Sequence, residues 1–295
     1  MISKPLVSII TPSLNQGRFI EDTICSVLSQ DYPQMEYIVI DGGSTDDTLE
    51  ILRKYDKRLQ WISEPDLGQG DAVNKGFSMA RGEILGWLNS DDTYTPRAVS
   101  TIVQYFLQSP ETVMVYGDAH FIDSHGHVTG EYPSERFRMK GLAKRCFLSQ
   151  PAVFIRAEVF RKVGPFNTRL QTCMDYEYWI RIGKSYPETA IAYLKGTFLA
   201  NSRSYSENKS ARFREIHYKE AMETAQKYFG FVLPFWKVAY MIGIAEERMK
   251  NFENSNVILR ALLRMFYISK IFGVRWAYRY FIISFEEWLL AKAKR

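Results

Sequence analysis

The first 115 residues alternate between short apolar runs and amphipathic stretches, and this alternation limits the fold more than any other feature of the sequence. Runs at residues 6–11, 36–40, 59–62, 82–88 and 112–116 are short and rich in apolar and β-branched side chains, as buried strands are. The stretches between them carry helix signals, including apolar residues three and four positions apart. Four strand–helix alternations predict a mostly parallel sheet with helices on both faces, since parallel neighbours need crossover connections.

Polar segments follow three of these runs, at the point where each expected strand ends. In open α/β sheets, ligands bind beyond the carboxyl ends of the strands. We therefore expect the segments to converge on one ligand site. Their residues are Thr11, Pro12 and Ser13 after the first run, Asp41 after the second, and Asp91 and Asp92 after the fourth.

Four acidic residues at three places in the chain are candidates for chemistry, and each place has a plainer alternative. Asp41 could accept a hydrogen bond from a nucleobase, with Gly42 allowing close backbone approach, or it could belong to a simple turn. Asp91 and Asp92 could share Mg²⁺ or Mn²⁺, or form an exposed acidic turn. Asp175 could be a general base, or a carboxylate favoured at a helix start by the helix dipole.

The strand–helix rhythm changes after residue 117. A hairpin is expected at 120–129, with its turn at His125-Gly126-His127, and an irregular basic stretch follows at 131–145. Further elements are expected as strands at 152–155 and 197–201 and as helices at 158–163 and 175–182. From residue 213 the chain has a helical pattern almost to its end. We therefore expect an α/β domain over residues 1–215 and a helical extension over residues 216–295.

The positive charge of the chain is concentrated in the extension. Residues 230–295 contain 11 Lys or Arg, 5 Asp or Glu and 14 aromatic residues, whereas residues 1–229 contain 27 basic and 28 acidic residues. This composition suits helices that lie on an anionic membrane surface. It equally suits helices that pack on the α/β domain or on a second copy in a homo-oligomer. A nucleic-acid partner is not expected, because the basic residues are scattered among aromatic ones.

Several other classes are excluded by what the sequence contains. The apolar fraction of 46% and the charged fraction of 24% are those of a globular protein, not of a disordered chain. Three cysteines without metal-like spacing suggest reduced thiols and a cytoplasmic location, and no signal peptide or 18-residue apolar run is evident. The glycine motifs of dinucleotide-binding oxidoreductases and P-loop nucleotidases are absent. His125 and His127 resemble a solvated turn more than a metal site.

Considered together, seven ordered sequence blocks resemble family 2 glycosyltransferases of the GT-A fold. The resemblance covers about residues 5–215, and the order and spacing of the blocks are more specific than any single motif. The blocks are VSIITPSLN at 7–15, IVIDGGSTD at 38–46, EPDLGQGDAVNKG at 64–76, GWLNSDD at 86–92, QPAVF at 150–154, VGPF at 163–166 and DYEYWIR at 175–181.

The resemblance implies a role for each matched position. It implies that Asp91 and Asp92 hold Mn²⁺ or Mg²⁺ and that Asp175 is the base. It implies an acceptor site near Glu177, Trp179 and Arg203. The positions implied for nucleotide-sugar binding are Thr11, Pro12, Ser13, Asn15, Asp41, Gly42, Asp66, Asp71, Asn74, Lys75, Asn89, Ser90 and Asp91.

The implied activity is inverting transfer of a single sugar. The donor would be a nucleotide-diphosphate sugar, with UDP as the expected nucleotide, and the acceptor a glycan or lipid-linked hydroxyl in surface polysaccharide synthesis at the inner membrane face. The motif Gln-x-x-Arg-Trp of processive synthases is absent. Asn89, Met174 and Tyr205 depart from the acidic or His residues common in relatives. An inactive glycan-binding relative and a sugar nucleotidyltransferase are the alternatives.

Overall fold

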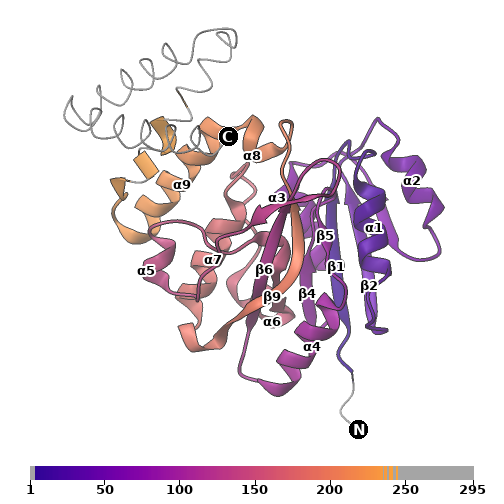
Figure 1. Ribbon diagram of the computed structural model, residues 1–295, viewed down its shortest axis with the longest axis horizontal. Helices are drawn as coiled ribbons and strands as arrows, with labels where there is room; N and C mark the ends of the chain where they lie inside the picture. Colours follow the sequence, from indigo (N-terminus) through magenta and orange to yellow (C-terminus); the bar gives the residue numbers. More distant parts are fainter. Residues whose placement is uncertain (1–3, 235, 238, 242–243, 245–295) are drawn as a thin grey trace, which may run out of the picture. The chain divides into compact units, whose positions relative to one another are not determined.

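The structure, a computed structural model, describes residues 4–234, 236–237, 239–241 and 244 (Figure 1). The chain forms two compact units, Met1–Asn208 and Lys209–Arg295. Their border lies a few residues before residue 215, where the sequence suggests one. The division of function between the two units stays a prediction.

The first unit contains nine strands and seven α-helices among its described residues. Its strands are β1 (Val7–Ser13), β2 (Met35–Asp41), β3 (Gln60–Ser63), β4 (Ile84–Trp87), β5 (Thr93–Tyr94), β6 (Met114–Ile122), β7 (Val128–Glu131), β8 (Val153–Arg156) and β9 (Ile191–Arg203). Its helices are α1 (Ile20–Leu28), α2 (Thr48–Lys54), α3 (Gln69–Met79), α4 (Ala98–Gln108), α5 (Met139–Leu142), α6 (Ala157–Val163) and α7 (Met174–Ser185). Two 3₁₀ turns are η1 (Gln150–Ala152) and η2 (Glu188–Ala190).

All nine strands belong to one mixed sheet, in the order β3-β2-β1-β4-β8-β6-β9-β5, with β7 paired to β6. The first half, β3-β2-β1-β4, is entirely parallel, as the sequence predicts. In the second half β8 runs antiparallel to both β4 and β6, whereas β6 and β9 are parallel. The strand order reverses its direction at β1 and β4, and α/β sheets bind ligands at such a reversal.

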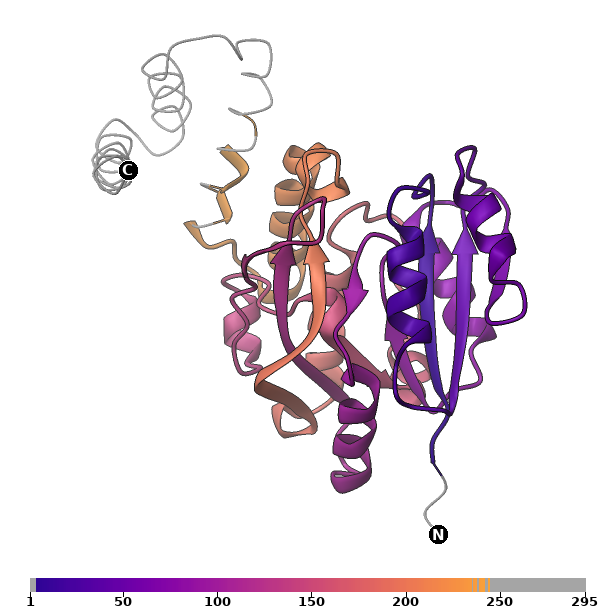
Figure 2. The ribbon, with the colours of Figure 1, turned by 45° about the vertical axis from the view of Figure 1, so that its right-hand side comes forward.

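Helices cover both faces of the parallel half (Figures 1 and 2). On one face Ile24 of α1, Leu52 of α2 and Ile102 of α4 belong to one buried cluster, which also contains Ile9 of β1 and Val39 of β2. On the other face α3 lies against β1 and β2, where Ala72 joins Ile38 and Ile40. These strands are apolar on both sides because both faces are buried, which explains their near-continuous apolar runs.

Several expected elements are longer or displaced in the structure. The strand expected at 112–116 is β6, which continues to Ile122, and the strand expected at 197–201 is the end of β9. The expected hairpin is present as β6 and β7, with His125 and His127 in its turn. The helix between the runs at 82–88 and 112–116 is α4, which starts at Ala98, after Arg97 in a left-handed conformation.

In the second unit the described residues form two helices, α8 (Lys209–Arg212) and α9 (Arg214–Phe229). A few residues after Phe229 are also described. Among the described residues, no helix combines the length and the apolar character needed to cross a membrane. The basic and aromatic segment at 245–295, on which the membrane-surface prediction depends, lies outside the described residues.

We expect Gly76→Ala to destabilise the fold, although alanine favours helices by about 1 kcal/mol over glycine. A methyl group on Gly76 of α3 would overlap Cγ2 of Ile10 in β1 and lie 3.0 Å from its Cγ1. Overpacking of this kind costs about 1–3 kcal/mol. Chemical denaturation should therefore show a lower free energy of unfolding.

Gly130→Ala in β7 is the matched control, because no atom lies within 4 Å of the added methyl group. Its free energy of unfolding should stay within about 0.5 kcal/mol of the wild-type value. Equal losses in the two variants would contradict the packing of α3 on β1.

At the amino ends of β1 and β2, a buried carboxylate ties three segments together. Glu36 accepts hydrogen bonds from the hydroxyl of Ser8, from the backbone and guanidinium of Arg81 (2.5 and 3.0 Å) and from the backbone of Gly82 (3.2 Å). Burial alone would raise the pKa of Glu36, but the hydrogen bonds from Ser8 and Arg81 outweigh it and lower this pKa below 4.5.

We expect Glu36→Gln to lower the free energy of unfolding by about 1–3 kcal/mol at neutral pH. The pKa of Glu36 is lower in the folded protein than in the unfolded chain, where it is 4.5. The extra stability of the wild-type protein over Glu36→Gln is therefore fully present above pH 4.5 and is lost as the pH falls through the folded pKa. Denaturation curves of both proteins between pH 7 and pH 3 test this, and a difference that grew in acid would contradict it.

Candidate active site

The carboxyl ends of β1, β2 and β3 align Ser13, Asp41 and Ser63 in one row of the sheet. Asp41 is fully buried, and its carboxylate accepts hydrogen bonds from the backbone of Gly43 (3.1 Å) and Ser44 (2.8 Å) and from the hydroxyls of Ser44 (2.5 Å) and Ser63 (2.7 Å). The side chain therefore fixes the loop after β2. Base recognition by Asp41 stays a prediction.

The loop after β1 is fastened to the loop after β2. Asn15 has a positive φ of 52°, and its backbone N–H donates to the hydroxyl of Ser44 at 2.7 Å. Its side-chain oxygen accepts from the backbone of Thr45 at 2.8 Å. The hydroxyl of Ser13 is buried and has no hydrogen-bond partner in the described part of the chain. Thr11 and Pro12 are also buried, and the Thr11 hydroxyl lies 3.1 Å from that of Tyr37, in the core.

The segment from β3 into α3 places two further predicted residues at the same edge. A methyl group on Gly42 would lie 2.8 Å from Oδ2 of Asp66, so that carboxylate lies against the β2 loop. Asp71 forms an ion pair with Lys75 at 3.3 Å, and Lys75 also pairs with Glu64 at 3.0 Å. The predicted donor-binding positions Gly42, Asp66, Asp71 and Lys75 therefore lie around one loop.

Asn74 binds the backbone of Phe166, and its predicted role near the donor stays a prediction. Its amide oxygen accepts from the backbone N–H of Phe166 at 2.8 Å, and its amide nitrogen donates to the backbone carbonyl of Phe166 at 3.0 Å. Phe166 in turn stacks on Tyr178 of α7, with ring centroids 3.9 Å apart. Asn74 thus ties α3 to the segment that leads into α7.

Asn89 is the centre of a hydrogen-bond network at the end of β4. Its oxygen accepts from Nε2 of Gln69 at 2.7 Å and from Nε1 of Trp87 at 2.9 Å. Its nitrogen donates to Oε1 of Gln150 at 2.9 Å and to Oδ2 of Asp92 at 3.2 Å. An aspartate here would lose both donated bonds, so the departure from the acidic residue of relatives fits this network.

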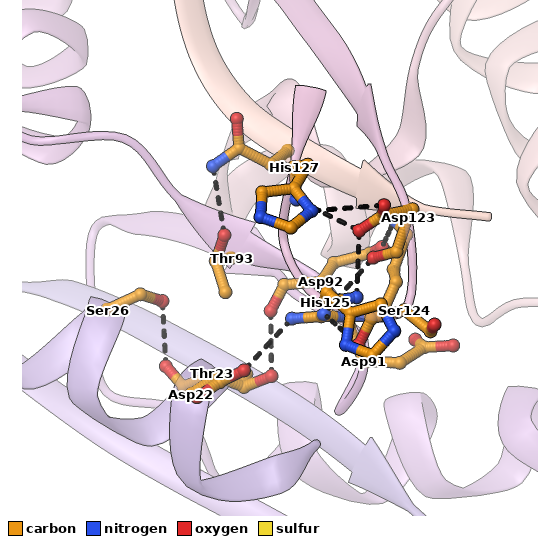
Figure 3. Close-up of polar contacts among 12 residues, drawn as sticks. Asp22, Thr23, Ser26, Asp91, Asp92, Thr93, Asp123, Ser124, His125 and His127 are labelled. Atoms are coloured by element: carbon orange, nitrogen blue, oxygen red, sulfur yellow. Dashed lines mark hydrogen bonds and ion pairs between the residues drawn. The ribbon is translucent and has the colours of Figure 1, made fainter. Parts of the chain in front are cut away.

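Asp91 and Asp92 are held from several sides (Figure 3). Asp92 is 4% exposed; its Oδ1 accepts from the backbone of Arg203 at 2.8 Å, and its carbonyl accepts from the hydroxyl of Thr23 at 2.7 Å. Asp91 is partly exposed, and its Oδ2 accepts from the hydroxyl of Tyr205 at 2.9 Å. Ser90, beside them, is buried. Of the pair, Asp91 is the less buried residue.

Arg203 is a buried connector at the end of β9. Its guanidinium donates to the backbone carbonyl of Asp91 at 2.8 Å and to those of Asp123 and Ser124 at 3.3 Å, and it forms an ion pair with Asp22 at 3.1 Å. It also lies 4.7 Å from the ring centroid of Phe19. Arg203 therefore joins α1, the β4–β5 loop and the β6–β7 turn.

The two adjacent carboxylates are chemically suited to a divalent cation. Burial raises the pKa of Asp92 well above its usual value, and the charge of Asp91 raises it further. Burial also raises the pKa of Asp91, while the hydrogen bond from Tyr205 opposes this change. Within the described residues, no Lys, Arg or His side chain forms an ion pair with either carboxylate, and no three His, Cys, Asp or Glu cluster as a metal site. Mg²⁺ and Mn²⁺ accept one or two carboxylates and complete their coordination with phosphate and water oxygens, so these residues fit such an ion.

Asp175 lies in the first turn of α7, and the residue before it, Met174, contacts the first turn of α3. A methyl group on Gly70, in the first turn of α3, would lie 3.1 Å from Sδ of Met174. Gln69, beside Gly70, carries the hydrogen bond to Asn89. The first turns of α3 and α7 thus meet, and they connect Asp175 to the segment that carries Asp91.

The three predicted acceptor residues are all buried. Glu177 is 3% exposed and pairs with Arg181 at 2.9 Å. Trp179 is also 3% exposed, and its indole nitrogen has no partner in the part of the chain that the structure describes. Arg203 is 5% exposed and makes the contacts given above. All three side chains lie in the interior of the protein, and direct contact with an acceptor stays a prediction.

Sequence reasoning assigned no role to Gln69, Gln150 or Asp22. Gln69 and Gln150 lie in the blocks that carry the resemblance, but only the fold shows that both amides bind Asn89. No sequence signal links Asp22 to Arg203, because the two are 181 positions apart.

We expect Arg203→Lys to lower the free energy of unfolding by about 2–3 kcal/mol, because lysine cannot keep the several directed bonds of a buried guanidinium. Arg97→Lys is the matched control, since Arg97 is 80% exposed and its ion pair with Asp31 is 3.6 Å long. Denaturant titration of both variants is the measurement. A loss no larger for Arg203→Lys than for the control would contradict the connector role.

Comparisons with known proteins identify the family and the fold of the chain. Residues 8–164 match the profile of "Glycosyl transferase family 2", which covers more than half of the chain. A protein of Rickettsia felis described as an uncharacterized glycosyltransferase is 29% identical over 224 residues, or 70% of this chain and 36% of that protein. The matched part of the chain thus spans about a third of that relative's length.

Two solved structures share the fold. The Staphylococcus aureus protein TarS, residues 1–349 with UDP-GlcNAc, matches with a TM-score of 0.60 and 15% identity over 96% of this chain and 92% of that one. The mannosyltransferase PcManGT of Pyrobaculum calidifontis, with GDP-Man and Mn²⁺, matches with a TM-score of 0.60 and 16% identity over 95% and 86%. The chain therefore belongs to glycosyl transferase family 2 and has the GT-A fold.

Proposed function

We propose that this protein transfers one sugar from a nucleotide-diphosphate donor to an acceptor hydroxyl, with inversion at the anomeric carbon. The observation that supports the proposal is that the first turns of α3 and α7 meet at Gly70 and Met174. Gln69 of α3 binds Asn89, two residues before Asp91, and Met174 precedes Asp175, so two segments 84 positions apart are linked through these turns. Membership of the family supplies the reaction class.

The donor would lie over the carboxyl ends of β1, β2 and β4. The rigid loops of Asn15 and Asp41 would hold the nucleoside, and the unpartnered hydroxyl of Ser13 offers it a buried hydrogen-bond group. Among matched solved structures, one holds UDP-GlcNAc and another GDP-Man, so both nucleotides are compatible with the fold. We favour UDP for this chain, as the sequence resemblance suggests.

The diphosphate end of the donor would lie beside Asp91. A divalent ion bound there supplies positive charge for the departing nucleotide diphosphate. Asp91 would hold that ion, whereas the buried Asp92 keeps the loop in place through Arg203 and Asn89. The hydroxyl of Tyr205 donates a hydrogen bond to the carboxylate of Asp91 and so orients it. Mn²⁺ is present in the matched mannosyltransferase, and Mn²⁺ and Mg²⁺ are the ions we propose here.

Asp175 would act on the acceptor side. Its carboxylate would take the proton of the acceptor hydroxyl as that oxygen attacks the anomeric carbon from the face opposite the leaving group. Such a displacement inverts the anomeric centre and needs no covalent intermediate on the protein. The acceptor we propose is a glycan or lipid-linked hydroxyl used in surface polysaccharide synthesis, reached from the cytoplasmic face of the membrane, with one sugar added.

Two substitutions should separate the roles of the carboxylates. Asp175→Asn should lower kcat at least about 100-fold while leaving the donor-induced rise in Tm intact, because it removes the base alone. Asp91→Asn should abolish the Mn²⁺-dependent rise in Tm with donor and lower turnover at least about 100-fold. The measurements are nucleotide release and thermal shift with a panel of UDP- and GDP-sugars, with and without Mn²⁺.

Asp31→Asn serves as the control, since Asp31 is a surface carboxylate paired with Arg97. It should behave as wild type in both assays. If the wild-type protein bound nucleotide sugars but never released a nucleotide with any acceptor, a binding role without catalysis would replace this proposal. Full activity of Asp175→Asn would remove Asp175 as the base.

A further inference from the structure

A strongly basic segment lies between β7 and η1 and has no part in the proposed chemistry. Residues 136–145 contain five basic residues and no acidic one. Four of them, Arg136, Arg138, Lys140 and Lys144, are exposed. In the described part of the chain none of these four side chains forms an ion pair, whereas Arg145 pairs with Glu135. The segment therefore presents four basic side chains to solvent, while the one carboxylate held on its backbone is that of Glu188, which accepts from the N–H of Met139 at 2.9 Å in the described part of the chain.

The backbone of the basic segment is fixed on α7, the helix that begins with Met174 and Asp175. The hydroxyl of Tyr176 donates to the carbonyl of Leu142 at 2.6 Å in the interior. Phe137 is buried, and a methyl group on Gly183 of α7 would lie 2.7 Å from its Cζ. The exposed basic side chains thus extend from a framework with buried anchors.

The basic segment also lies close to Asp175. Cys146 follows it directly, and the hydroxyl of Tyr132 donates to the Cys146 carbonyl at 3.3 Å. Burial raises the pKa of the Cys146 thiol, the charge of Asp175 raises it further, and the charge of Arg145 lowers it. Asp175 and Arg145 therefore both lie near the half-buried thiol of Cys146. Tyr176, next to Asp175, makes the second link to the segment.

We propose that the basic segment 136–145 binds the anionic part of a phosphate-bearing acceptor and so directs the acceptor's hydroxyl toward Asp175. This inference rests on the proposed transferase function and specifies its substrate class. Lysine and arginine donate charge-assisted hydrogen bonds to phosphate oxygens, and arginine does so in pairs. A neutral glycan would gain little from these side chains.

A phosphate-bearing solute fits the segment better than a bilayer does. Binding at a membrane interface combines basic residues with exposed apolar or aromatic ones that enter the lipid. The large apolar side chains exposed in the described residues include Leu14, Leu67 and Val128, and none lies in residues 136–145. Phe137 and Leu142 of the segment are both buried. The segment therefore offers charge without an apolar anchor.

The test measures binding of inorganic tripolyphosphate to the full chain by calorimetry, with saturating UDP and Mn²⁺ present to occupy the donor site. We expect binding that weakens as salt rises. The triple variant R136Q/K140Q/K144Q should bind tripolyphosphate at least about tenfold more weakly, because the loss of one hydrogen bond between charged groups lowers affinity about tenfold. The single variant R138Q should show a smaller loss, and it serves if the triple variant fails to fold.

The matched control is R53Q/K54Q/K57Q, which removes three exposed basic residues of α2 and the turn after it, on the other side of the first unit (Figure 1). It should bind tripolyphosphate as wild type does. Equal affinity of wild type and R136Q/K140Q/K144Q, or no binding by wild type, would overturn the proposal. Loss of binding to phosphatidylglycerol vesicles in R136Q/K140Q/K144Q, with tripolyphosphate binding unchanged, would replace it with a membrane role.

Nucleotide release from UDP- and GDP-sugars by the wild-type protein separates this inference from the proposed function. Release without selective tripolyphosphate binding would leave the transferase proposal standing and overturn the acceptor class. Tripolyphosphate binding by the segment in a protein that turns over no nucleotide sugar would overturn the transferase proposal, and with it the acceptor role of the segment.

Discussion

Two adjacent carboxylates, Asp91 and Asp92, occupy a largely buried position, and the arrangement of the candidate site depends on the hydrogen-bond donors around them. Asn89, Tyr205 and the backbone of Arg203 donate to their oxygens. The guanidinium of Arg203 binds the loop backbone and Asp22 instead of the carboxylates. Among the described residues no Lys, Arg or His side chain forms an ion pair with the two carboxylates, and a bound cation would favour their charged form.

The same donors link parts of the chain that meet only in the folded state. Arg203 connects β9 to α1 and to the β6–β7 turn, and Asn89 connects β4 to α3 and η1. Asn74 then joins α3 to the segment before α7. A change in any of these contacts would move Asp91 relative to Asp175. The proposed site therefore depends on side chains that are expected to touch no substrate.

Some features of the fold follow from the sequence because they depend on local patterns. The apolar runs of β1, β2 and β4 predict buried strands, and the helices between successive strands predict that the strands are parallel. The second half of the sheet is less predictable. β8 is short and apolar like the others, yet it runs antiparallel to both of its neighbours, β4 and β6. Pairing partners of this kind depend on distant segments.

The sequence by itself determined the residue types at the strand ends and, through its ordered blocks, the family. Only the tertiary structure decided that Asp92 is more buried than Asp91. Exposure depends on contacts such as that of Arg203 with Asp92, which are 111 positions apart. It also decided that Asn74, Glu177 and Arg203 bind their own chain. A motif specifies chemical groups, whereas their partners and their access to solvent arise from packing between remote segments.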